Sequence, residues 1–257
     1  MRGERGLAAV TEDAALGGRL RLLQPHSGHR FGHDAILLAA AIAARSGDHV
    51  VDLGAGVGAA GLALAARVTG VRVTLVDIDA HLMGLARRNI CLNGFEHRIR
   101  AVSLDVAAPT SAFSAAGLKS GSAAQVMMNP PFNDPVRQNR SPEVARARAH
   151  TASQDTLAIW TKTAARLLAP KGVLTLIWRA DGLADVLAAL ERGFGGISVC
   201  PVHARPSAAA IRILVRALKA SNTPLVLAPA FYLSDESGKV TAAAEAVLRE
   251  GASLPLA

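Results

Sequence analysis

The chain has 257 residues, of which 51% are hydrophobic, and its mean hydropathy is +0.28. Much of this apolar content is alanine, and the longest apolar run, Ala35 to Ala44, is about half of a membrane-spanning helix. The chain carries 28 Lys and Arg against 20 Asp and Glu, a net charge of +8. We therefore expect a soluble protein without a membrane partner, and the charge favours a polyanionic partner such as RNA or DNA.

The N-terminal segment 1–18 contains acids and has no apolar core, so it does not have the pattern of a signal peptide. We expect this segment to be flexible. Cys91 and Cys200 lie far apart in the sequence, and no ligand-spaced cluster is present. This usage predicts two reduced thiols in a cytoplasmic protein and no metal site.

Strands and helices alternate along the chain. The apolar and β-branched runs predict strands at 19–24, 48–53, 71–77, 98–105, 124–129, 173–178, 197–203 and 211–218. The segments between and after them predict helices at 33–44, 58–68, 80–92, 154–168, 182–190 and 241–249, with Asp181 as an N-cap and Asn93-Gly94 as a C-cap.

This alternation predicts a mostly parallel sheet with helices on both faces. The last two strands are joined too briefly for a helical crossover, so one of them should be antiparallel. We see no linker that separates two domains. The expected fold is α/β, a single Rossmann-like doubly wound sheet of about seven strands over residues 19–257. A short N-terminal β extension and a C-terminal tail of strand and helix complete it.

The first chemical motif is "VVDLGAGVGAAG", from Val50 to Gly61. Asp52 ends a strand, and Gly54, Gly56 and Gly58 lead into a helix. Glycines in this place allow a tight turn and let a ligand approach the backbone. Asp77 ends the next strand, where its carboxylate can accept both hydroxyl groups of a ribose. The pattern indicates a nucleoside-containing cofactor.

The same glycines formally satisfy the dinucleotide fingerprint, but a lone match of that kind has low specificity. Asp52 favours S-adenosylmethionine, since its carboxylate can hold a cationic amine and would repel a pyrophosphate. The tetrapeptide Asn129–Phe132, which follows the fourth strand, has no role in hydride transfer. Its two prolines fix their own φ angles and predict a stiff loop.

At this point the chain resembles the class I methyltransferases that modify planar amino nitrogens, in "VDLGAGVG", in Asp77 and in "NPPF". The segments "LGGRLRLLQPHSGHRFGHDAILLAA", "ARARAHT", "LLAPKGVLTLIWRAD" and "VHARPSAAAIRILVRALK" are similar to the bacterial tRNA-valine adenine-N6 methyltransferase family. The resemblance runs from about Thr11 to Glu250. It implies S-adenosylmethionine as the methyl donor and tRNA as a partner.

The resemblance also implies roles for single residues. In the catalytic tetrapeptide Asn129, Pro130, Pro131 and Phe132, the Asn129 side-chain oxygen and the Pro130 carbonyl accept hydrogen bonds from the amine, and Phe132 stacks on the base. The implied cofactor-binding residues are Asp34, Asp52, Gly54, Gly56, Gly58, Asp77, Asp105 and Asn129.

The loop expected at 133–151 carries Arg137, Arg140, Arg146 and Arg148. One interpretation is a phosphate-gripping lid for RNA beside the catalytic loop, and the other is an ordinary solvated face. Ser141 as an N-cap and Pro142 as the first helical residue predict that part of this loop is helical.

Three alternatives remain open at this point. A glutamine-N5 protein methyltransferase uses the same tetrapeptide, but it usually carries a helical substrate domain before the glycine motif. A small-molecule O-methyltransferase typically needs a metal or a catalytic base, and no such cluster is evident. A nucleotide-binding module of the dehydrogenase type is the third. The sequence leaves open whether the protein is a monomer or a homodimer.

Overall fold

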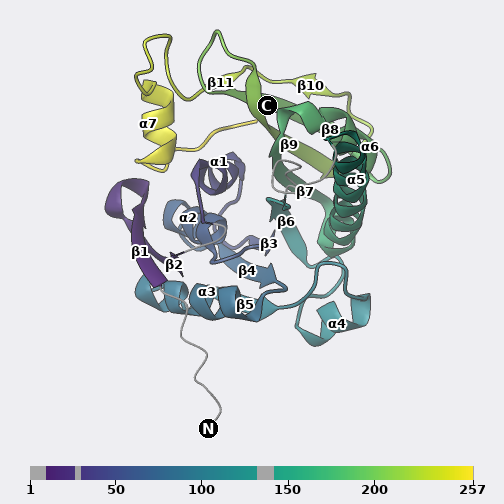
Figure 1. Cartoon of the computed structure of the whole chain (residues 1–257). Coiled ribbons are helices and arrows are strands. Elements are labelled where there is room, and N and C mark those ends of the chain that lie inside the picture. The colour runs from purple at the N-terminus through teal and green to yellow at the C-terminus, as the bar shows by residue number, and fades with distance from the viewer. Residues whose placement is uncertain (1–9, 27–29, 132–141, 257) are drawn as a thin grey trace.

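The computed structural model describes residues 10–26, 30–131 and 142–256, and the side chains of 142–153 lie outside this description. A mostly parallel sheet occupies the centre (Figure 1). Its strand order is β10-β8-β9-β7-β6-β3-β4-β5, and β11 also pairs with β8. The strands are β3 His49–Leu53, β4 Arg72–Asp77, β5 Ile99–Ser103, β6 Ala123–Met128, β7 Leu168–Arg179, β8 Phe194–His203, β9 Ala210–Lys219, β10 Val226–Leu227 and β11 Phe231–Tyr232.

The sheet confirms the predicted Rossmann-like α/β fold and its antiparallel edge. Strand β9 runs antiparallel to both β7 and β8, whereas β3, β4, β5 and β6 are parallel to their neighbours. The sheet has more strands than predicted because β10 and β11 add to its edge. Each of these is only two residues long, too short for an alternating pattern to appear in the sequence.

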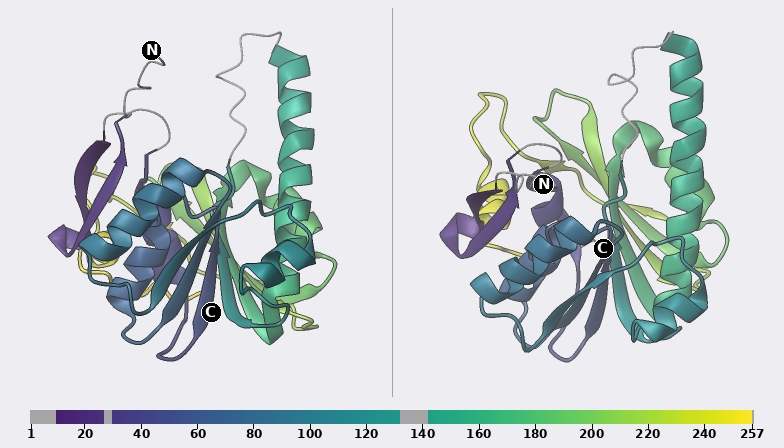
Figure 2. Two further views of the ribbon diagram at one scale, coloured as in Figure 1. Left: turned by 90° about the horizontal axis from the view of Figure 1, so that it is seen from below. Right: turned by 60° about the horizontal axis from the view of Figure 1, so that its bottom comes forward.

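Helices cover both faces of the sheet (Figure 2). One face packs against α1 His33–Ala41, α2 Ala59–Arg67 and α3 Ala80–Leu92, with α7 Ala242–Leu248 beside α1. The other packs against α4 Thr110–Ala115, α5 Pro142–Leu167 and α6 Leu183–Leu190. In β3, Val50 belongs to the first apolar cluster and Val51 to the second, as expected for a strand buried on both faces.

An antiparallel hairpin of β1 Val10–Ala15 and β2 Leu20–Pro25 precedes the sheet. The prediction of a flexible segment over 1–18 is therefore wrong for residues 10–18. The pattern "VTEDAA" has no apolar alternation, and β1 is ordered through its pairing with β2. Strand β2 is itself held by α3, because the side chains of Asn89 and Asn93 bond the main chain of Leu23 and Arg21.

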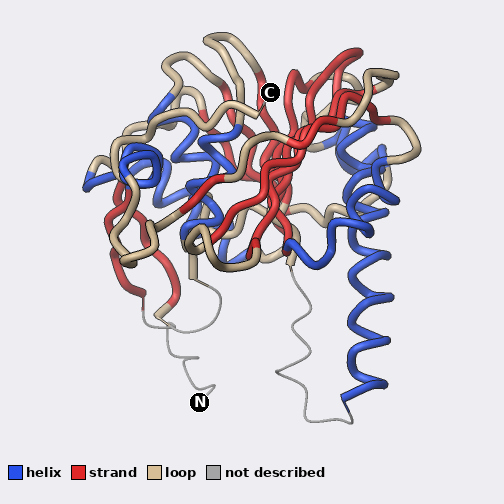
Figure 3. Tube along the Cα trace, turned by 90° about the horizontal axis from the view of Figure 1, so that it is seen from above, coloured by secondary structure: helices blue, strands red, loops and turns tan. Residues whose placement is uncertain are grey.

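Two further predictions differ from the structure. Helix α5 begins at Pro142, so the loop expected at 133–151 is wrong from that residue onward, and the predicted helical part is confirmed. The helix extends past the sheet at the end where β6 terminates (Figure 3). The N-cap of α6 is Gly182, while the side chain of Asp181 pairs with Arg179 at 2.9 Å. An ion pair with the neighbouring strand end thus replaces the cap.

None of the helices that the structure describes combines the length and the apolarity needed to cross a membrane.

Candidate functional site

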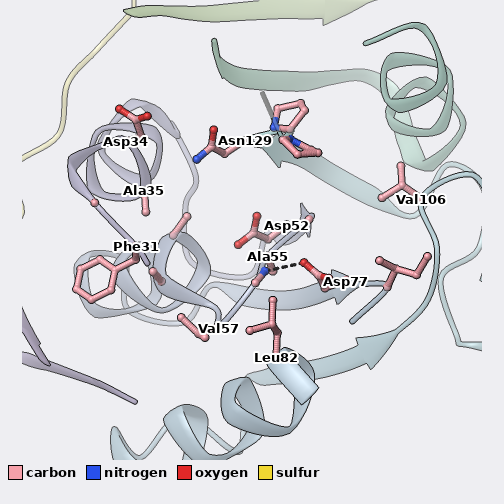
Figure 4. A pocket seen from close by; sticks show the side chains of 18 of the residues that line it. Phe31, Asp34, Ala35, Asp52, Ala55, Val57, Asp77, Leu82, Val106 and Asn129 are labelled. Atoms are coloured by element: carbon pink, nitrogen blue, oxygen red, sulfur yellow. Dashed lines mark hydrogen bonds between the residues drawn. The ribbon is translucent and has the colours of Figure 1, made fainter. Parts of the chain in front are cut away.

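A cavity of about 550 Å³ opens at the carboxyl ends of β3, β4 and β6 (Figure 4). Ligands bind at this edge of open α/β sheets, where the strand order reverses. The lining residues that the sequence predicted are Asp34, Asp52, Gly54, Gly56, Asp77, Asp105, Asn129, Pro130 and Pro131. Residues from Asp34 to Pro131, far apart in the chain, thus meet in one cavity.

The glycine loop after β3 requires its glycines for two different reasons. Gly54 has a φ of +70°, and a Cβ there would lie 2.3 Å from the Trp160 ring. Gly56 has a φ of +55°, but a Cβ there would meet nothing within 4 Å. The loop is fixed to β4, since the N–H groups of Gly54 and Ala55 donate to the Val76 carbonyl at 2.8 and 3.0 Å. The main chain therefore forms one wall of the cavity.

Gly58 does not line the cavity, contrary to its predicted role in cofactor binding. It is the N-cap of α2, and a Cβ there would come within 2.7 Å of Leu75 Cδ1. Gly61, in the first turns of α2, faces Leu75 in the same way at 2.3 Å. These two glycines bring α2 close to β4. They affect the cavity through the position of the helix, and Gly61 also does so through its N–H group, which donates to Asp52 Oδ2.

Asp77 joins the glycine loop to the next strand. Its Oδ2 accepts a hydrogen bond from the Gly56 N–H at 2.8 Å, and its Oδ1 accepts one from the Asp79 N–H at 2.9 Å. Asp79 in turn caps α3. Each Asp77 oxygen has lone-pair capacity beyond these single bonds, and the side chain is only half-buried. The carboxylate is held in a fixed orientation and is still able to accept from a ligand.

Asp52 is a buried carboxyl group beneath the glycine loop, with 2% of its surface exposed. Its Oδ2 accepts a hydrogen bond from the Gly61 N–H at 3.1 Å. The pKa of Asp52 is raised to about 8, chiefly by burial; the Gly61 hydrogen bond lowers it and the nearby Asp77 carboxylate raises it, and about 8 is the net result. The group is therefore mostly neutral at pH 7 until a cation comes near it.

Asn129 follows β6 and points into the cavity (Figure 4). Its Oδ1 atom is buried and has no hydrogen-bond partner among the described residues. A buried amide oxygen without a partner costs about 1–3 kcal/mol, so this atom is suited to a donor that a ligand brings. Pro130 beside it is buried, and Pro131 is exposed. Phe132, the predicted stacking residue, lies outside the described residues.

Two other predicted acids line the cavity with partners of their own. Asp34, in the first turn of α1, accepts a hydrogen bond from Arg212 Nε of β9 at 2.9 Å. Asp105 follows β5, and its Oδ1 accepts from the Ala107 N–H at 2.8 Å, which fixes the turn that carries it. Both carboxylates are thus oriented by the fold.

The sequence did not point to the apolar lining. Phe31 comes from the segment before α1, and Trp160 comes from α5. Ile78 stands directly after Asp77 and is 67% exposed, which is unusual for an isoleucine beside a buried strand. Only this last position could have been anticipated, because it follows a predicted ligand at a strand end. Leu82 and Val106 complete the apolar wall.

The arginines of the predicted lid are only partly placed. Arg137 and Arg140 lie outside the described residues. Arg146 and Arg148 belong to α5, but their side chains are outside the description. Across the described part of the chain, no three His, Cys, Asp or Glu side chains gather so as to hold a metal ion.

Comparisons with known proteins show which family this chain is similar to. Residues 26–204 match the family model of the methyltransferase small domain. The chain is 30% identical over 191 residues to a tRNA1(Val) (adenine(37)-N6)-methyltransferase of Phocaeicola vulgatus, covering 72% of this chain and 75% of the relative. It is 29% identical to a release factor glutamine methyltransferase of Chlorobaculum tepidum, over 58% of this chain and 52% of that protein.

A solved structure from Agrobacterium tumefaciens, described as a predicted O-methyltransferase, is 30% identical. It superposes with a TM-score of 0.73 over 86% of this chain and 98% of its own. The family match covers more than half of the 257 residues and includes the glycine loop, Asp77 and Asn129. The chain therefore belongs to the methyltransferase small domain family and is an S-adenosylmethionine-dependent methyltransferase.

Proposed function

We propose that this enzyme methylates the N6 amine of an adenine in tRNA. One observation supports the chemistry above all others: the Asn129 Oδ1 atom is buried, without a hydrogen-bond partner among the described residues, in the cavity that also contains Asp52 and Asp77. A planar amine brings the N–H donor that this oxygen lacks.

The cavity has the features that S-adenosylmethionine requires. Asp77 would accept the ribose hydroxyl groups, and Asp105 with the apolar side chains of Ile78 and Val106 would hold the adenine ring. Asp52 and Asp34 would face the methionine end, where a cationic amine would convert Asp52 to its charged form. When bound, the cofactor supplies a methyl group on a positively charged sulfur.

Asn129 and Pro130 would prepare the amine for attack. The lone pair of an exocyclic adenine nitrogen is delocalised into the ring, so the amine is a poor nucleophile. The Asn129 Oδ1 atom and the Pro130 carbonyl each accept one N–H bond, which draws the nitrogen toward tetrahedral geometry. The same acceptors stabilise the positive charge that develops on nitrogen. Two successive prolines hold these oxygens in place before substrate arrives.

No general base is needed before methyl transfer in this scheme. After transfer the methylated nitrogen is positively charged and its proton is acidic, so this proton is then lost to water. Asp52 is not required as a base in this scheme, which fits its position: it is buried under the glycine loop and bonded to the Gly61 N–H. Its role is with the cofactor.

The choice of tRNA rests on similarity and charge. The Phocaeicola relative is named for a tRNA adenine, and the net charge of +8 suits a polyanionic substrate. The principal alternative is a protein glutamine, because the Chlorobaculum relative is named for it and an amide also offers two N–H donors. An alcohol, as for an O-methyltransferase, offers a single donor and would satisfy only one of the two acceptors.

The test is a transfer assay with methyl-labelled S-adenosylmethionine. Separate reactions contain unmodified tRNA, ribosomal RNA and a bacterial release factor. We expect label in tRNA, released on digestion as N6-methyladenosine. Label in the release factor alone, or in ribosomal RNA alone, would overturn the tRNA assignment. The variant Asn129→Ala in the same assay separates enzymatic transfer from contamination, because it should lose the signal.

A further inference from the structure

A second cavity, of about 520 Å³, lies at the amino ends of β3, β4 and β5, on the side of the sheet opposite the carboxyl ends that line the first cavity. Strand β3 has five residues, so about 16 Å of strand separates this edge from the candidate methyl-transfer cavity. The cavity is strongly basic. Among the described residues that line it are one acid, Glu96, and six basic residues: His49, Arg72, His97, Arg98, Arg100 and Lys119.

The register of the sheet places several of these side chains on one face. His49 pairs with Arg72 in the β3–β4 ladder, and Thr74 pairs with Arg100 in the β4–β5 ladder. Arg72 and Thr74 are two residues apart in β4 and therefore share a face. The segment after α4 covers the same region, since His49 Nδ1 lies 3.4 Å from the Ser122 carbonyl oxygen. The result is a concave surface instead of a row of separate surface charges.

The positive charges of this cavity are not neutralised by carboxylates. The guanidinium groups of Arg72, Arg98 and Arg100 donate to the carbonyl oxygens of Gly47, Val68 and Ala116. These bonds hold the side chains but leave their charge uncompensated, and no ion pair joins them to an acid within the described residues.

Two further side chains complete the site. The Arg98 guanidinium lies 4.5 Å from the centre of the Phe95 ring, which orients it. The ammonium group of Lys119, on the loop that covers the cavity, has no hydrogen-bond or ion-pair partner in the part of the chain described, whereas the Lys119 carbonyl accepts from Ser122. A guanidinium fork with free N–H groups matches phosphate oxygens in geometry as well as in charge.

The pKa of His49 depends on the same positive charges. Burial lowers the pKa of His49, and the charges of Arg72 and Arg100 lower it further, while its contact with the Ser122 carbonyl raises it. The imidazole is also held at Nε2 by the Thr74 hydroxyl, 2.9 Å away. An anion in the cavity would offset the arginine charges, so the His49 ring reports on occupancy.

We propose that this cavity is a phosphate-binding site separate from the methyl-transfer site. Its ligand is a phosphate group, carried either by a free phosphate compound such as a nucleotide or by the phosphodiester backbone of an RNA. The proposal does not depend on which amine the enzyme methylates, because it rests on charge and geometry at the opposite edge of the sheet.

Calorimetry with inorganic pyrophosphate tests the site directly. The protein is first saturated with S-adenosylhomocysteine, so that binding of pyrophosphate to the first cavity does not contribute to the measured heat. We expect saturable binding to the wild type, about tenfold weaker in Lys119→Ala and in Arg72→Ala, since each loses one charge-assisted contact. The matched control is Arg192→Ala, an exposed arginine at the same edge that does not line the cavity. Its affinity should equal that of the wild type.

The His49 ring gives a second readout that does not depend on heat. In NMR spectra, pyrophosphate should raise the His49 pKa in the wild type and raise it less in Lys119→Ala at the same concentration. Absence of binding, or equal weakening in Arg192→Ala, would overturn the proposal. The affinity for tRNA shows the source of the phosphate. If Lys119→Ala lowers the affinity for tRNA, and added pyrophosphate lowers it in the wild type in the same way, the site binds an RNA backbone. Unchanged tRNA affinity assigns it to a free phosphate compound.

Discussion

At the scale of single residues, Asn129 should separate catalysis from cofactor binding. We expect Asn129→Ala to lower kcat by about 10²–10³-fold, because it removes one acceptor that stabilises charge only in the transition state. The affinity for S-adenosylhomocysteine, measured by calorimetry, should change by less than about threefold. Equal losses in both measurements would mean that Asn129 supports the structure of the loop instead. Arg192→Ala is a suitable control, as Arg192 is exposed and lines neither cavity.

Asp52 should make the stability of the cofactor-free protein depend on pH. Its pKa is raised in the folded state from 3.8 to about 8, so its contribution is fully present below pH 3.8 and is lost as the pH rises through 8. Between these values one such group costs about 1.4 kcal/mol of stability per pH unit. Asp52→Asn keeps the shape and removes the titration.

The measurement is urea denaturation of both proteins from pH 5 to pH 8. The difference between them cancels the titration of all other groups. We expect the Asn variant to gain stability over the wild type as the pH rises. A constant difference across this range would show that Asp52 is ionised in the folded protein, and that its burial is relieved by water.

The same two residues show what the sequence could provide. The position of Asp52 before the glycines and of Asn129 before the prolines was enough to predict that both lie at one place, and both line one cavity. The sequence did not indicate that Gly58 faces Leu75, because the same spacing of glycines serves packing as well as ligand approach. Nor did it indicate Trp160, whose place depends on how α5 packs.

At the scale of elements, α3 connects the N-terminal hairpin to the glycine loop. The buried Asn89 side chain accepts from the Leu23 N–H at 2.7 Å and donates to the carbonyl oxygens of Leu23 and Val57 at 2.9 and 3.0 Å. It thereby completes the hydrogen bonding of β2, which has β1 on its other side. One side chain couples three elements around the cavity.

We expect Asn89→Ala to destabilise the protein by roughly 2–3 kcal/mol, since it leaves buried main-chain groups of the hairpin and the loop without partners. Hydrogen exchange at the Leu23 amide should become faster. The control is Asn93→Ala, one turn further along α3, which bonds Arg21 in a more exposed place and should cost less than about 1.5 kcal/mol. If the two variants were equally destabilised, or if Leu23 stayed protected, the coupling through Asn89 would be refuted.

The elements themselves were predictable wherever their pattern was long. The central strands β3, β4 and β6 lie within about one residue of their predicted bounds, and α3 matches at both ends. Strand β1 was missed because its residues alternate in neither polarity nor size, and pairing with β2 decides its state. Helix α5 was predicted too short because its first turns are rich in polar residues.

At the scale of the whole molecule, the acidic cavity and the basic cavity lie at opposite ends of the strands. The carboxyl ends of the strands carry the acids Asp52, Asp77 and Asp105, whereas the amino ends carry arginines. A ligand with a cationic methionine end and a polyanion are thus attracted to different edges. The sequence predicted the acids at the ends of the strands, but the net charge of +8 did not indicate that basic side chains gather at the opposite ends.

The net charge of +8 leads to a prediction about tRNA affinity and salt. If Arg146 and Arg148 contact phosphates, the double reversal Arg146→Glu with Arg148→Glu should weaken tRNA binding. It should also flatten the slope of log affinity against log salt by about two, because each lost phosphate contact releases one counterion fewer. Fluorescence anisotropy with labelled tRNA measures the affinity and its salt slope, over roughly 50 to 200 mM salt, where the loss of phosphate contacts changes affinity strongly.

The control must change the net charge equally while leaving the catalytic edge intact. Lys171→Glu with Arg192→Glu does so, because both residues are exposed and line neither cavity. Lys171 lies near the start of β7 and Arg192 lies just before β8, at the end of the sheet opposite the methyl-transfer cavity. We expect this control to keep most of the wild-type slope, since long-range charge is screened over about 10 Å at 0.1 M salt. Equal slopes for the two double variants would mean that tRNA is attracted by total charge alone, and that the start of α5 does not grip the RNA.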